Sequence, residues 1–162
     1  MATAEHHLSD YDPTSVPSGA GRRFALVVSE WNKEITDALR EGARATLVKH
    51  GVSAGDIVEE WVPGSFELAS GAQFMLERGG FDAVVCLGSV VRGETPHFDF
   101  VCQGATQGIM AVGLKFSVPV IFGLLTDDTM DQARDRSGGK HGNKGVDCAV
   151  AALKMAALKA RN

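Results

Sequence analysis

Residues 88–97 read Gly-Ser-Val-Val-Arg-Gly-Glu-Thr-Pro-His, and they decide how the rest of the chain is interpreted. The apolar run 83–87 before them is short and rich in β-branched residues, which is typical of a buried strand. After them, apolar residues recur at intervals of three and four up to Phe116, which predicts a helix. We therefore expect a loop that leaves the carboxyl end of a strand and enters a helix N-terminus, where free N–H groups and the helix dipole favour an anion.

The last residues of this loop have two interpretations. Thr95 and Pro96 suit a helix start, Thr as a cap and Pro in the first turn. On that interpretation the loop is an ordinary strand-to-helix turn, and His97 is a solvated residue beside the cap. Alternatively, His97 is a proton-transfer group in a site to which other loops contribute.

The strand-then-helix pattern recurs along the chain. Short apolar strands separated by amphipathic helices predict an α/β protein with three α/β/α layers around a four-stranded parallel, flavodoxin-like sheet. Residues 1–21 are rich in Ser, Asp, Pro and Gly and have no period, so we expect an N-terminal arm followed by a single domain over residues 22–162. The expected strands are residues 24–28, 57–62, 83–87 and 119–125.

Composition excludes several classes of function. A net charge of -4 over 162 residues gives no basic footprint for nucleic acid. No apolar run reaches the roughly 20 residues of a membrane span, and the N-terminus lacks the pattern of a signal peptide. The three cysteines have no CxxC spacing, so we expect buried free thiols in the reducing cytoplasm. His6 and His7 fall in the arm and His50 ends a helix, so no metal site is predicted.

Ligands of such folds bind beyond the carboxyl ends of the parallel strands. Polar and aromatic residues follow all four predicted strands, which predicts a small-molecule site there. Trp31 is either a core anchor or a ring that stacks on a flat heterocycle, and Phe66 is either core or part of this site. Glu67 either complements the helix dipole or accepts hydrogen bonds from ring N–H groups. Arg92 is either a phosphate ligand or a partner in a structural salt bridge.

The glycine- and lysine-rich stretch 138–145 is not a nucleotide phosphate loop. It follows a helix rather than a strand and lacks the G-x-x-x-x-G-K-[ST] spacing. Beside Arg136, a loop of this composition suits an anion or a subunit contact.

Five blocks of sequence together resemble the 6,7-dimethyl-8-ribityllumazine synthase family, from about Arg22 to Lys159. This resemblance implies an enzyme that condenses 5-amino-6-(D-ribitylamino)uracil with 3,4-dihydroxy-2-butanone 4-phosphate, releasing phosphate and water, without cofactor or metal. The blocks are Trp-Asn at 31–32, Pro-Gly-Ser-Phe-Glu at 63–67, residues 88–99, Phe-Gly-Leu-Leu-Thr at 122–126 and Gly-Asn-Lys-Gly at 142–145.

The resemblance also implies roles for individual residues. His97 would transfer protons, and Trp31 would stack on the pyrimidine where many members have Phe. Arg136 would reach the phosphate from the neighbouring subunit, and Phe122 of that subunit would help to bind the pyrimidine and ribityl groups. The remaining assignments are Ser65, Phe66 and Glu67 for the ribityl chain and nearby polar atoms; Ser89, Val90 and Val91 for the pyrimidine edge; Glu94 and Thr95 for the phosphate; and Asn32, Arg92 and Lys144 as supporting residues.

Family members often have a small residue at the position of Glu94, so we expect its side chain to point away from the phosphate. The resemblance further implies pentamers, and the uninterrupted loop 138–143 resembles that of members that assemble into icosahedral shells. Riboflavin synthase is then a candidate partner. Two other hypotheses are a flavin- or lumazine-binding module without catalysis and a structural shell protein.

Overall fold

The computed structural model of the chain describes residues 7–161. Its sheet has the order β2-β1-β3-β4, and all four strands are parallel. The strands are β1 (Phe24–Ser29), β2 (Ile57–Val62), β3 (Ala83–Val91) and β4 (Val120–Asp127). The α-helices are α1 (Lys33–Lys49), α2 (Leu68–Arg78), α3 (His97–Phe116), α4 (Met130–Arg136) and α5 (Lys144–Lys159).

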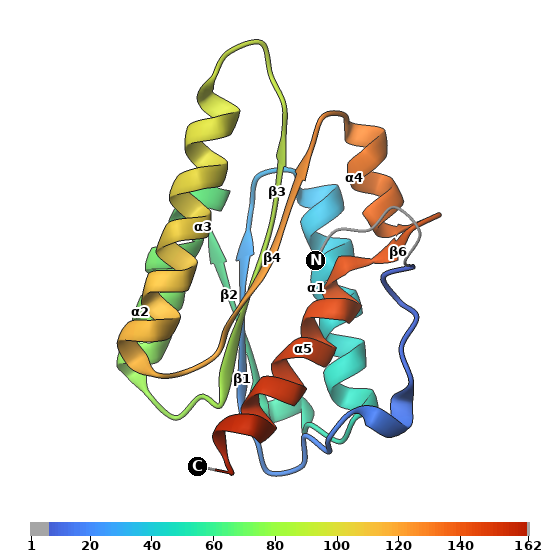
Figure 1. Cartoon of the computed structure of the whole chain (residues 1–162), viewed down its shortest axis with the longest axis vertical. Helices are drawn as coiled ribbons and strands as arrows, with labels where there is room; N and C mark the ends of the chain where they lie inside the picture. The colour runs from blue at the N-terminus through green and yellow to red at the C-terminus, as the bar shows by residue number, and fades with distance from the viewer. Residues whose placement is uncertain (1–6, 162) are drawn as a thin grey trace.

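Helices cover both faces of this sheet (Figure 1). On one face α1 and α5 bury Leu39, Leu47 and Leu153 against β1 and β3. On the other face α2 and α3 bury Leu68 and Ile109 against the same two strands. The central strands are thus apolar on both sides, which is why they appear in the sequence as continuous hydrophobic runs. The predicted three-layer, flavodoxin-like fold is confirmed.

The main error in the predicted boundaries concerns β3. Residues 88–91 were expected to be loop, but Ser89, Val90 and Val91 continue the strand and pair with residues 125–127 of β4. The β-branched valines extend the hydrogen-bonded ladder of the strand. Position 88 has room only for glycine, because a Cβ there would lie 2.8 Å from the Ser65 hydroxyl oxygen. The longer strand carries these residues to the edge of the cavity described below.

The expected cap of α3 is wrong, and α4 and α2 begin in other ways. Thr95 does not cap α3: the N-cap is Pro96, and no side chain caps the helix. Thr126 and Asp127 belong to β4, and α4 is capped by Thr129, which accepts a hydrogen bond from the Gln132 N–H. A 3-10 turn, Ser65–Glu67, precedes α2.

The described part of the predicted arm packs on the chain's own domain. Leu8 N–H donates to the His141 carbonyl at 2.7 Å, and the Ser9 hydroxyl oxygen accepts from Asn143 N–H at 3.0 Å. The segment expected to be a loop at 138–143 instead forms a small antiparallel hairpin, β5 (Ser137–Gly139) with β6 (Gly142–Asn143). Arm residues 1–6, including His6, lie outside the described residues, and the division at residues 21 and 22 stays a prediction.

Candidate active site

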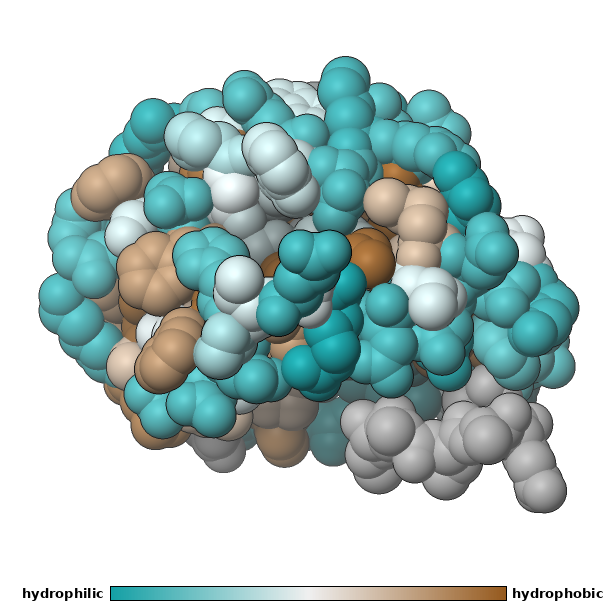
Figure 2. Space-filling model, turned by 90° about the horizontal axis from the view of Figure 1, so that it is seen from above, coloured by the Kyte–Doolittle hydropathy of each residue, from teal (hydrophilic) through white to brown (hydrophobic). Residues whose placement is uncertain are grey.

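A cavity of about 610 Å³ opens at the carboxyl ends of β1, β2 and β3, beside the N-terminus of α3. Figure 2 shows this end of the molecule, where hydrophobic side chains gather on the side of α2 and α3. Nine of the predicted site residues line the cavity. They are Trp31, Ser65, Phe66, Glu67, Ser89, Val90, Val91, Thr95 and His97.

Two aromatic rings lie in this cavity without being buried. The Trp31 side chain is 70% exposed and that of Phe66 is 57% exposed, so neither is a core anchor. Asn32, in the left-handed region with φ 58°, donates from its side chain to the Ser89 carbonyl at 3.0 Å and ties the turn after Trp31 to β3. A Cβ at Gly104 of α3 would lie 2.5 Å from Cε2 of Phe66, so this glycine lets the helix pack directly against the ring.

Two buried serines add polar atoms to the same cavity. Ser65 and Ser89 are 5% and 0% exposed, and neither hydroxyl has a hydrogen-bond partner among the described residues. A buried hydroxyl without a partner costs about 1–3 kcal/mol. A ligand that binds here could recover part of that cost by pairing with them.

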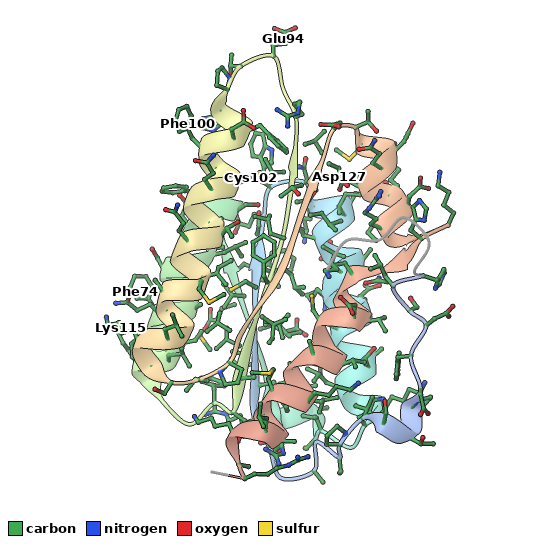
Figure 3. The ribbon with its side chains drawn as sticks, viewed as in Figure 1. Phe74, Glu94, Phe100, Cys102, Lys115 and Asp127 are labelled. Carbon is green, nitrogen blue, oxygen red and sulfur yellow. The ribbon has the colours of Figure 1, made fainter. Side chains whose placement is uncertain are left out.

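His97 is the first residue of α3 and lies exposed at the cavity wall. Its imidazole makes no hydrogen bond or ion pair to the described residues, so no structural role in the chain accounts for it. Glu94, in contrast, lies at the outer tip of the β3–α3 loop and does not line the cavity (Figure 3). Its position agrees with the expectation that its side chain points away from a phosphate at the helix N-terminus.

Arg92 forms a salt bridge within this chain, as one of its two interpretations expected, and its role toward a phosphate stays a prediction. Its Nε donates to Oδ1 of Asp128 at 2.8 Å, and its Nη1 lies 3.3 Å from Oδ1 of Asp99. The guanidinium also lies over the Phe98 ring, 4.1 Å from the centroid. Within the chain, these contacts hold the β3–α3 loop.

Lys144 is also held within the chain. Its ammonium lies 2.6 Å from a carboxylate oxygen of Asp147. Burial lowers the pKa of Lys144, but the hydrogen bond that it donates to Asp147 and the negative charges of Cys148 and Asp147 together raise that pKa above its ordinary value. Like Asn32 and Arg92, Lys144 lies outside the cavity lining.

Phe122 and Arg136 are likewise not in this chain's cavity. Phe122 lies on β4, the edge strand of the sheet, and is 37% exposed. Arg136 ends α4, where its Nη1 donates to the Gln132 carbonyl at 3.3 Å and lies 3.8 Å from Oδ1 of Asp127. Burial raises the pKa of Asp127, Arg136 opposes that shift, and Asp128 adds to it.

Several residues of this region were not predicted from the sequence. Phe100 lines the cavity and is 70% exposed; it lies one helical turn after His97, a spacing that could have identified it. Gly64, Gly93, Phe98 and Val101 also line the cavity. Asp127 is the buried last residue of β4.

The chain matches one family model over residues 21–160, and that model describes 6,7-dimethyl-8-ribityllumazine synthase. The chain belongs to this family. A protein of that name from Porphyromonas gingivalis is 55% identical over 98% of this chain and 99% of its own length. A protein of the same name from Phocaeicola vulgatus is 55% identical over 98% of this chain and 95% of its own length. Another, from Parabacteroides distasonis, is 56% identical over 96% of this chain and 97% of its own length.

The family assignment confirms the resemblance found in the sequence.

Within residues 7–161, no helix is long and apolar enough to cross a membrane. Over the same range, no group of three or more His, Cys, Asp or Glu side chains could hold a metal ion. Cys86 and Cys148 are buried free thiols as predicted, whereas Cys102 is half-buried.

Proposed function

We propose that this chain condenses 5-amino-6-(D-ribitylamino)uracil with 3,4-dihydroxy-2-butanone 4-phosphate to give 6,7-dimethyl-8-ribityllumazine, phosphate and water. The protein is then a transferase of riboflavin biosynthesis. The observation that carries the proposal is the cavity of about 610 Å³, which holds Trp31, Phe66 and His97 in a chain of this family.

The pyrimidine binds between aromatic rings and buried hydroxyls. The exposed face of Trp31 offers a stacking surface for a flat heterocycle, and Phe66 offers a second apolar wall. Ser65 and Ser89 supply polar atoms that have no partner within the chain. Glu67 accepts hydrogen bonds from polar hydrogens of the substrate, and the Val90 and Val91 backbone lines the ring edge.

The phosphate binds at the N-terminus of α3, near Glu94 and Thr95. Backbone N–H groups and the positive end of the 20-residue helix favour a dianion there. However, the described residues that line the cavity include no Lys or Arg. We therefore assign the missing cation to Arg136 of an adjacent copy of the chain, which brings Phe122 to the same site and Lys144 near it.

His97 transfers protons during the reaction. The amine of the pyrimidine attacks the ketone, one water and the phosphate leave, and the ring closes with loss of a second water. Each step moves a proton, for which an imidazole is suited because it can both accept and donate one. Because two substrates held side by side gain up to roughly 7–11 kcal/mol from proximity alone, much of the catalysis is positioning.

The site requires a cyclic assembly, and we propose a pentamer. An apolar groove of about 420 Å³ on each chain includes Met110 and Leu114 of α3, residues 118–121 before and in β4, and Leu158 of α5. A second copy that covers this groove would also cover the open edge of β4. The hairpin at 137–143 suits a closed icosahedral shell. Riboflavin synthase is the candidate partner inside that shell. The expected location of the protein is the cytoplasm.

Purified protein incubated with both substrates tests the activity. Lumazine fluorescence that appears only when both substrates are present is the expected result. Binding of lumazine or flavin without product formation would instead identify a non-catalytic module. Light scattering tests the assembly, and a single pentamer-sized species at all pH values and phosphate concentrations would exclude the shell.

A further inference from the structure

Asp127 is a buried carboxylate with one unsatisfied oxygen. It is the last residue of β4, beside α4 (Figure 3), and only 6% of it is exposed. Oδ2 has no hydrogen-bond donor among the described residues, and Oδ1 lies 3.8 Å from Nη1 of Arg136. A carboxylate at this depth normally has hydrogen bonds to both oxygens, so its position beside Arg136 calls for an explanation.

The contact between these two residues acts through charge rather than through a hydrogen bond. A separation of 3.8 Å is too long for a hydrogen bond, and the bond that Nη1 does make is to the Gln132 carbonyl at 3.3 Å. Asp127 therefore does not orient the guanidinium directly. Its negative charge, screened little because it is buried, lowers the positive potential that Arg136 presents to any anion.

The neighbouring carboxylate has a different partner. Asp128 is 65% exposed at its side chain and bonds to Nε of Arg92 at 2.8 Å. The two acidic residues thus follow one another in sequence but face two different arginines. Of the two, only Asp127 forms an ion pair with Arg136 among the described residues.

We propose that Asp127 acts on the phosphate site through the charge of Arg136 and weakens the hold of that arginine on phosphate. This inference rests on the proposed function, in which Arg136 binds the phosphate of a substrate held by the adjacent copy. Phosphate is both a substrate group and a product of the reaction. A guanidinium with no opposing charge would retain the product, whereas one that faces Asp127 releases it more readily.

The test measures the affinity of the assembled full-length protein for inorganic phosphate. Asp127→Asn keeps the size of the side chain and removes its charge, so phosphate should bind about three- to tenfold more tightly. Phosphate should become a stronger product inhibitor, and KM for the butanone phosphate should fall. Asp128→Asn removes the same charge one residue later, on the side of Arg92, and should change phosphate affinity by less than about twofold.

An unchanged or weaker phosphate affinity in Asp127→Asn would overturn the inference, because Asp127 would then merely support the fold or Arg136. Asp127→Ser, also uncharged, replaces the Asn variant if that variant does not assemble. Combining Asp127→Asn with Arg136→Ala completes a double-mutant cycle, and the effect of the Asn substitution should vanish without the arginine. If Arg136→Ala alone leaves phosphate affinity unchanged, then the phosphate role of Arg136 in the proposed function is what fails.

Discussion

The cavity at the carboxyl ends of β1, β2 and β3 and the surface formed by β4 and α4 differ in what they offer a substrate. The cavity has exposed aromatic rings, two unpaired hydroxyls and His97, but no cation among its described lining residues. The β4–α4 surface has a cation, Arg136, and an exposed ring, Phe122, but neither lies in that cavity. Each region therefore has what the other lacks for binding a phosphorylated substrate, and a cyclic arrangement of chains would join them.

The largest expected effect comes from His97, the proposed proton-transfer group of the cavity region. His97→Ala should lower turnover by about ten- to a thousandfold, while substrate affinity changes little, because the positioning groups remain. Steady-state kinetics with both substrates measures this effect, and His141→Ala is the matched control outside the cavity lining. Undiminished turnover would remove His97 from the mechanism.

The corresponding change on the β4–α4 surface is Arg136→Ala. Loss of one charge-assisted hydrogen bond should raise KM for the butanone phosphate by about ten- to a hundredfold. Affinity for the pyrimidine should stay the same, because Trp31 and Phe66 are untouched. Arg134→Ala is a suitable control, since that guanidinium is paired with Glu34 at 2.9 Å. Equal losses of affinity for both substrates would contradict the division into two regions.

Mixed assemblies test directly whether the two regions belong to different chains. Co-expressed His97→Ala and Arg136→Ala chains that assemble at random would give about a quarter of sites with both residues intact, since each interface pairs two chains independently. Activity should therefore approach that fraction of wild type and exceed that of either variant. If both residues served one chain's site, no mixed site could be intact, and the activity would equal the average of the two variants.

Most of the fold could be predicted from the sequence, because each central strand is a continuous apolar run and each helix has one apolar stripe. The cavity could be predicted in part: Trp31, Phe66 and His97 each follow a strand, and parallel strands end at one edge. The extension of β3 could not be predicted, because it depends on the long-range pairing of Ser89 with Leu125 of β4. In the local sequence, Gly88 instead indicates the start of a loop.

The ion-pair partners and the burial of the charged residues were the least predictable part of the site. Arg92 has the same chemistry whether it binds phosphate or Asp128, and only the folded geometry shows its contact with Asp128. Asp127 is in a turn-like sequence, so its burial depends on the register of β4 with β3. The partner of Arg136 in the active assembly stays a prediction, because a contact between copies leaves no periodic signal along one chain.

Trp31 offers a smaller, spectroscopic test of the cavity region. Binding of a pyrimidine analogue should quench its fluorescence, because the ring would stack on a side chain that is 70% exposed in the single chain. The other tryptophan, Trp61, is half-buried with the ammonium of Lys33 lying 4.1 Å from its ring centroid, and it should respond little. Trp31→Ala should therefore abolish the quench. A quench that persists in this variant would show that Trp31 does not stack on the ligand.

The smallest expected effect concerns the stability of the β4–α4 surface. Burial raises the pKa of Asp127 above its ordinary value of 3.8, against the opposing effect of Arg136. The stability that this residue contributes is fully present below that ordinary value and is lost as the pH rises through the higher pKa of the folded state. Asp127→Asn does not ionise, so at pH 7 it should raise the melting temperature by about 1–3 °C. The gain should shrink as the pH falls toward 3.8, because a growing share of wild-type Asp127 is then protonated.

Asp128→Asn is the control for this measurement, because it removes an exposed ion pair and should not raise the melting temperature. A wild type more stable than Asp127→Asn at pH 7 would mean that the ion pair with Arg136 outweighs the burial of the carboxylate. A stabilised variant that also binds phosphate more tightly would be the strongest result. It would mean that the chain retains a destabilising charge at a position where that charge aids the release of phosphate.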